Sequence, residues 1–79
     1  MKINKLSLYN NEKVVIENYN NIKDINDDCI IIDKYYINGE NLKIKQIEEY
    51  FIIIIGVINS IIINSDNKWN TMFLPQKII

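Results

Sequence analysis

The most apolar part of the chain is the run YFIIIIGVINSIII, residues 50–63. It has a glycine at position 56 and two polar residues at 59–60, and it is shorter than the about 20 apolar residues that span a bilayer. Isoleucine is a strong strand former, so the run predicts two successive core strands with Gly56 at the bend between them. We therefore expect a protein without a membrane span.

The first half of this run does not alternate between apolar and polar residues. A strand that is apolar on both faces is normally covered on both faces, and left bare it is prone to aggregate. Either another segment of the chain or a second copy of the protein should cover it. The candidate interaction surface therefore includes Phe51, Ile52 and Ile54, and self-association is one expectation.

Outside this run, turn residues recur about every 8 to 10 positions, the spacing of short antiparallel strands. Asn10-Asn11 favours a tight hairpin, because Asn tolerates positive φ. Asn38-Gly39 is the strongest turn signal and predicts a second hairpin, and Glu48-Glu49 ends the strand that follows. The prediction is all-β: one small antiparallel meander of seven or eight short strands, curled into a roll or sandwich.

The composition excludes several function classes. Among 79 residues there are twenty Ile, thirteen Asn and nine Lys, with no Ala, Arg or His, and the net charge is −1. Without His, the commonest general base and neutral metal ligand are absent, and the single Cys29 cannot form an intramolecular disulfide. Cys29 is expected to be a small buried apolar residue. We therefore expect that the protein is not an enzyme and that it binds no cofactor.

Two further constellations have a functional and a plainer interpretation. The carboxylates of residues 24, 27, 28 and 33 suggest calcium, but their spacing lacks the glycine and glutamate of an EF-hand loop, which favours a solvated turn. Lysines and tyrosines could form an RNA-stacking face, yet these residue types are also ordinary on the solvent side of a sheet; they are Tyr35, Tyr36, Lys43, Lys45 and Tyr50. No nucleic acid is expected.

The chain divides into a β domain, residues 1–66, and an irregular C-terminal tail, residues 67–79, with Trp69 and Phe73. Pro75 argues against a long helix there. These aromatic residues either fold back to cap the sheet or dock a partner, since Trp and Phe supply large contact areas. Both alternatives stay open.

The segments INGENLKIKQI (37–47) and FIIIIGVINSI (51–61) resemble the YabP/YqfC family of sporulation proteins. That family carries a G-K-N-L-x-I segment, a short acidic turn and an Ile-rich segment with a glycine. The matching positions are Gly39, Asn41, Leu42, Ile44, Ile53, Ile55, Gly56, Ile58 and Ile61. The resemblance covers about residues 3–63, with Asn20-Asn21 where the family has a glycine.

The resemblance implies a small, non-enzymatic, β-rich structural or interaction protein of endospore formation. It would act in the cytoplasm on the mother-cell side of the forespore, near the developing spore surface, with a protein partner that is itself membrane-bound. The Lys-, Asn- and Ile-rich composition is typical of AT-rich Firmicute genomes. The alternative is a small protein-binding module unrelated to sporulation, such as a phage or mobile-element inhibitor.

Overall fold

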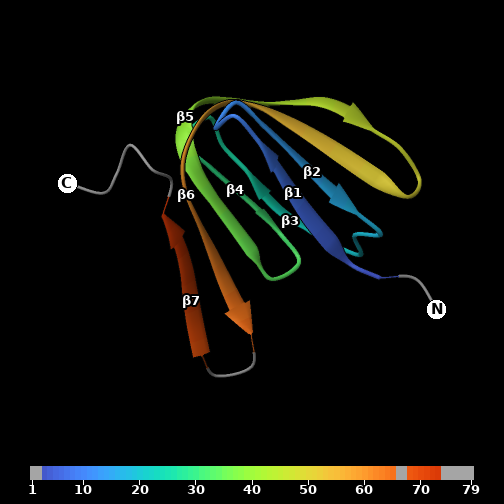
Figure 1. Cartoon of the computed structure of the whole chain (residues 1–79). Helices are drawn as coiled ribbons and strands as arrows, with labels where there is room; N and C mark the ends of the chain where they lie inside the picture. Colours follow the sequence, from blue (N-terminus) through green and yellow to red (C-terminus); the bar gives the residue numbers. More distant parts are fainter. Residues whose placement is uncertain (1–2, 66–67, 74–79) are drawn as a thin grey trace.

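The computed structural model describes residues 3–65 and 68–73, with side chains described for residues 3–64. All regular structure in this part of the chain is β (Figure 1). The strands are β1 (Lys5–Tyr9), β2 (Lys13–Glu17), β3 (Ile22–Ile25), β4 (Cys29–Ile32), β5 (Tyr35–Ile47), β6 (Phe51–Ser65) and β7 (Lys68–Phe73). The predicted all-β class is confirmed.

The strands form one antiparallel sheet in the order β1-β2-β6-β5-β4-β3, and β7 also pairs with β6. From β3 to β7 the chain is a meander, because each strand pairs with the next. The β1–β2 hairpin departs from the predicted simple meander, since β2 pairs with the distant β6. The connection from β2 to β3 therefore crosses from one side of the sheet to the other edge.

The sheet is folded over on itself because its two longest strands, β5 and β6, bend in the middle (Figure 1). We call β1, β2, residues 43–47 and residues 51–55 the first half-sheet. The second half-sheet contains β3, β4, residues 35–38, residues 60–65 and β7. Residues from both halves and from the bends between them form a single core: Val14, Ile16, Ile30, Ile32, Tyr35, Ile37, Leu42, Ile52, Ile54, Ile58 and Ile61.

The predicted hairpin turn at Asn38-Gly39 is wrong, because both residues lie inside β5. The chain reverses instead at Asp33-Lys34, between the paired residues Ile32 and Tyr35, and Asp33 has a φ of 53°. Gly39 serves the bend: a Cβ there would lie 1.9 Å from the carbonyl oxygen of Val57. The glycine lets the backbones of β5 and β6 approach more closely than any side chain would permit.

Gly56 also lies within a strand, so the predicted break into two strands is wrong, although a bend is present. Its φ of +139° favours glycine, and a Cβ would lie 2.7 Å from the Asn41 carbonyl oxygen. The ladder between β5 and β6 is irregular here, with register shifts on both sides of residues 39–40. Bulges of this kind increase local twist and bend a strand.

At each bend, backbone N–H groups donate hydrogen bonds to carbonyl oxygens of turns from elsewhere in the chain. Gly39 donates to Asp28 O and Leu42 to Asp27 O, at 3.1 and 2.8 Å. On β6, the N–H groups of residues 56 and 58 donate to the carbonyl oxygens of residues 12 and 11, at 3.1 and 2.9 Å. The bends therefore keep their buried donors satisfied.

The hairpin predicted at Asn10-Asn11 is confirmed. Both residues have positive φ, 51° and 58°, and the Glu12 N–H donates to Tyr9 O at 3.0 Å. The turn predicted at Glu48-Glu49 is also present between β5 and β6, where the Glu48 N–H donates to Phe51 O at 2.8 Å. The Asn pair and the Glu pair thus both lie in turns that reverse the chain, as the sequence predicts.

The prediction of an irregular C-terminal segment is wrong for part of it, because Lys68–Phe73 forms the strand β7. It pairs with β6 in a register that sets Trp69 opposite Asn64 and Phe73 opposite Ser60. β2 covers only the first part of β6 on this side, so the later part has backbone groups that β7 satisfies. The side chains of Trp69 and Phe73, and residues 74–79, lie outside the described residues.

Candidate interaction surface

Two residues of the predicted interaction surface belong to the core instead. Ile52 and Ile54 are fully buried, and they pair with Ile16 and Val14 on the inner face of the first half-sheet. The sequence run is apolar on both faces, so it could not reveal which alternate residues face inward. The pairing with β2, whose own residues 14 and 16 are buried, settles that choice.

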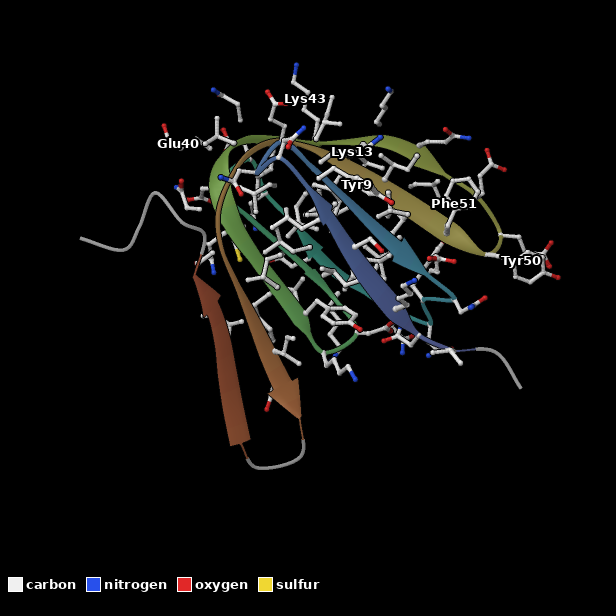
Figure 2. All side chains as sticks on the ribbon, viewed as in Figure 1. Tyr9, Lys13, Glu40, Lys43, Tyr50 and Phe51 are labelled. Atoms are coloured by element: carbon white, nitrogen blue, oxygen red, sulfur yellow. The ribbon has the colours of Figure 1, made fainter. Side chains whose placement is uncertain are left out.

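The opposite, outer face of the first half-sheet carries a second set of apolar residues. Alternation along β2 and β6 directs four side chains to this face, and each is half-buried. Val15 of β2 pairs with Ile53 of β6, and this pair forms the middle row across the two strands. Phe51 and Ile55 belong to the rows on either side, where they pair with Glu17 and Lys13. We call this set the outer apolar patch: Val15, Phe51, Ile53 and Ile55. None of the described strands covers it (Figure 2).

Lysines border the outer apolar patch at the end nearest the bends. Ile55 lies between Lys13 of β2 and Lys43 of β5, and Tyr9 of β1 pairs with Lys13. The Lys13 ammonium lies 4.9 Å from the centre of the Tyr9 ring, a cation–π distance. Lys43 is exposed and projects away from the body of the molecule in Figure 2.

Carboxylates gather at the opposite end of the same face. Glu17 pairs with Phe51 in the last row, and the turn that precedes β6 carries Glu48 and Glu49, both exposed. Lys5, opposite Glu17 on β1, is the cation of this row. The face therefore runs from a positive row beside Ile55 to a predominantly acidic end.

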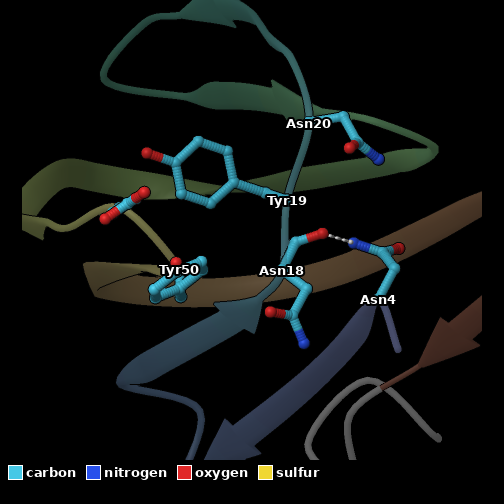
Figure 3. A pocket seen from close by; sticks show the side chains of 6 residues that line it. Asn4, Asn18, Tyr19, Asn20 and Tyr50 are labelled. Carbon is cyan, nitrogen blue, oxygen red and sulfur yellow. Dashed lines mark hydrogen bonds between the residues drawn. The ribbon is translucent and has the colours of Figure 1, made fainter. Parts of the chain in front are cut away.

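A separate hollow of about 320 Å³ opens at this acidic end, between the start of β1, the end of β2 and the β5–β6 turn (Figure 3). Its lining is polar and aromatic: Asn4, Asn18, Tyr19, Asn20, Glu49 and Tyr50. Of these residues only Tyr50 was a candidate on the sequence, for RNA stacking, because the lining side chains come from three segments that are distant along the chain.

Asp33 holds the chain in place beside this hollow. Its carboxylate accepts hydrogen bonds from the backbone N–H groups of Asn20 and Asn21, at 2.8–3.1 Å, and from Asn4 Nδ2 at 3.1 Å. Hydrogen bonds to a charged acceptor are stronger than neutral ones. Asp33 is therefore a structural residue that fixes the β2–β3 crossover to the β4–β5 turn.

The other carboxylates considered for calcium do not assemble with it. Within the residues that the structure describes, no three His, Cys, Asp or Glu side chains lie close enough to hold a metal ion. Asp24, exposed on β3, accepts a hydrogen bond at 3.0 Å from Asn26 Nδ2 in the turn between β3 and β4. This arrangement matches a solvated turn.

The lysines and tyrosines considered for RNA stacking do not share one face. Tyr35 is buried in the core, 5% exposed, while its neighbour Tyr36 points the other way in the second half-sheet. Lys43 belongs to the outer face of the first half-sheet, and Tyr50 lies in the β5–β6 turn. A stacking surface would need these rings side by side on one exposed sheet face.

Cys29 is half-buried rather than fully buried. Burial raises the pKa of its thiol, and the nearby carboxylates of Asp28 and Asp24 raise it further. The pKa of the Tyr35 hydroxyl is also raised, by burial first and then by Asp33. Both groups therefore stay protonated at neutral pH, and Cys29 is a poor nucleophile.

No protein-family model matches the sequence, and no curated protein or solved structure matches it. In the part of the chain that the structure describes, no helix is long and apolar enough to cross a membrane.

Proposed function

We propose that the protein is a non-enzymatic structural protein of endospore formation that acts by binding other proteins through the outer apolar patch. The observation that carries the proposal is the outer apolar patch itself, a set of apolar side chains on a sheet face that no described strand covers, with charged residues at both ends. Apolar centres with polar borders are the usual anatomy of protein–protein contacts.

The occupant that fits this face best is a second copy of the chain. In a two-fold arrangement, the row with Lys13 and Lys43 of one copy would lie over the acidic end, Glu17 and Glu48-Glu49, of the other. Ile53, in the middle row, would then contact its own counterpart near the axis. Opposite charges would meet at both ends, and the apolar rows would exclude water between them.

The setting of endospore formation rests on the resemblance of residues 37–47 and 51–61 to the YabP/YqfC family. The fold supports a structural reason for that resemblance, since Gly39, Asn41 and Gly56 meet where β5 and β6 bend. A protein that keeps this bend would present the same outer face. The protein would act on the mother-cell side of the forespore, with a membrane-bound protein as a further partner.

An NMR concentration series on the isolated chain tests the binding face. Amide signals of β1, β2 and residues 51–55 should shift as the concentration rises, while those of β3 and β4 stay fixed. The variant Ile53→Lys should abolish these shifts, because a buried unpaired ammonium opposes association. Ile31→Lys is the matched control, since Ile31 is half-buried on the outer face of the second half-sheet. Shifts spread over β3 and β4 would contradict the proposal.

A fluorescent fusion in the native host tests the setting. The wild-type fusion should appear after asymmetric division and collect around the forespore, and the Ile53→Lys fusion should be diffuse. A constitutive signal, or a host that does not sporulate, would refute the sporulation setting. In that case a protein-binding module of the phage or mobile-element inhibitor type would account for the same surface.

A further inference from the structure

The hollow at the acidic end of the first half-sheet is rich in hydrogen-bond acceptors. Asn4 Nδ2 donates to the backbone oxygens of Glu17 and Asn18, both at 3.4 Å, and to the Asp33 carboxylate at 3.1 Å. Asn18 Nδ2 donates to the backbone oxygen of Ile3 at 2.7 Å. These partners only accept hydrogen bonds, so they fix the orientation of both amides. These contacts hold the two amide side chains in place at the edge of the hollow.

Two tyrosine rings form further walls of the hollow (Figure 3). The Tyr19 hydroxyl donates to the backbone oxygen of Glu48 at 2.9 Å, which holds that ring against the β5–β6 turn. The Tyr50 backbone oxygen accepts the N–H of Asn18, which ties the turn to the end of β2. Aromatic faces carry negative electrostatic potential and attract cations.

Glu49 adds a negative charge to this lining, and no lysine of residues 3–64 is among the side chains that line the hollow. The carboxylate and the ring faces together favour one class of ligand group, a cation with an alkyl stem. A lysine side chain has an ammonium with three donors and four methylenes that can lie along a ring.

We infer that this hollow is a binding site for a lysine side chain presented by a protein partner. The ammonium would lie between the Glu49 carboxylate and the rings of Tyr19 and Tyr50, and the methylene stem would contact a ring. The inference rests on the proposed function, because it names the chemistry of a protein partner. None of the residues that line the hollow belongs to the outer apolar patch, but Glu49 also lies at the acidic end that would face a second copy.

The test is an NMR titration of the full chain with Nα-acetyl-lysine N-methylamide. A single side chain should bind with a Kd on the order of 1 mM, and the amide signals of residues 18–20 and 49–50 should shift. The neutral control probe is the same compound acetylated at Nε, which keeps the stem and removes the charge. It should bind at least about fivefold more weakly, because cation–π attraction and charge pairing are both lost.

Variants separate this site from general attraction to an acidic surface. Glu49→Gln and Tyr50→Leu should each raise the Kd about threefold or more. Glu48→Gln is the matched control, because Glu48 does not line the hollow and its carboxylate accepts from Gln46 Nε2 at 2.9 Å. It should have less than half the effect of Glu49→Gln.

Equal binding of the two probes, equal effects of Glu48→Gln and Glu49→Gln, or no shifts at about ten times the expected Kd would each overturn the inference. The titration is run on the Ile53→Lys variant as well as on the wild-type chain, because that variant should stay monomeric and leave Glu49 uncovered. A failure here therefore leaves the outer apolar patch untouched, and a failure of self-association leaves the titration interpretable.

Discussion

Replacing Gly39 by alanine should destabilise the fold severely, although its φ is not in the left-handed region. The added Cβ would lie 1.9 Å from the Val57 carbonyl oxygen, whereas real Cβ contacts stay beyond 3.0 Å. One backbone must therefore move by 3.0 − 1.9 = 1.1 Å. The obstacle is backbone rather than a flexible side chain, so β5 and β6 would have to separate at the bend.

The free energy of this change can be worked from its parts. Overpacking of a well-packed site costs about 1–3 kcal/mol. The movement also strains the two hydrogen bonds from β5 to the β3–β4 turn, at 3.1 and 2.8 Å, each worth about 1 kcal/mol. The sum is about 3–5 kcal/mol, a large share of the about 4–12 kcal/mol expected for a domain of this length.

Urea denaturation followed by circular dichroism measures the change. With an m-value of about 1 kcal/mol/M, the midpoint for Gly39→Ala should fall by about 3 M or more. Asn41→Gly is the control at the same bend: Asn41 has a φ of 53°, which glycine adopts freely. Its stability should stay within about 0.5 kcal/mol of wild type. A Gly39→Ala midpoint equal to that of wild type would refute the close approach of the two backbones.

Three further predictions follow from burial, hydrogen bonding and ionisation. Ile54→Ala should lower stability by about 2–5 kcal/mol, because Ile54 is fully buried. Ile53→Ala should cost about 1 kcal/mol, because Ile53 is half-buried on the outer face. Equal losses of stability in urea denaturation would contradict the assignment of Ile54 to the inner face and Ile53 to the outer face. Asp33→Asn should cost about 1–2 kcal/mol, because an amide NH2 in place of Oδ2 cannot accept from Asn4 Nδ2, and the N–H groups of Asn20 and Asn21 lose a charged acceptor. Thermal melting should show this loss, and an unchanged Tm would refute the structural role of Asp33. Folding raises the pKa of both Cys29 and Tyr35, so their contribution to stability is fully present below their ordinary pKa values of 9.0 and 10.0 and is lost as the pH rises through the folded pKa values. Denaturation from pH 7 to 11 should therefore show a loss of stability that is smaller in the double variant Cys29→Ser, Tyr35→Phe. An equal loss of stability in that variant would contradict the assignment.

The strand content could be predicted from the sequence, because Ile, Val and Tyr alternate between turn residues at short intervals. Asn10-Asn11 forms its hairpin as predicted, since both residues adopt the positive φ that Asn tolerates. The pairing of β2 with β6 could not be predicted, because it joins segments more than 30 residues apart. No local pattern encodes such a contact.

The two glycines show where local turn chemistry is ambiguous. Asn38-Gly39 has the composition of a hairpin turn, but Gly39 is required for a close approach to Val57 within a continuous strand. Gly56 adopts a φ of +139° without ending β6. In both cases the glycine permits a bend, and only the packing of β5 on β6 distinguishes a bend from a reversal.

The candidate interaction surface stays a prediction, but the structure shows which of its residues face outward. Phe51 lies on the outer face, whereas Ile52 and Ile54 face the core, and the outward-facing isoleucines of this run are Ile53 and Ile55. A run of four isoleucines has no polar residue to mark its exposed face. The hollow beside Tyr50 escaped prediction because its lining comes from three segments that only the tertiary fold brings together.

The most direct test of the outer apolar patch is the molecular mass in solution, measured by sedimentation equilibrium across the micromolar range. The chain has a mass of 9.4 kDa. We expect the wild-type chain and Ile31→Lys to approach twice that mass at high concentration, and Ile53→Lys to stay at the monomer mass. A wild-type chain that remains monomeric at high micromolar concentration, or an Ile53→Lys variant that still dimerises, would contradict the account.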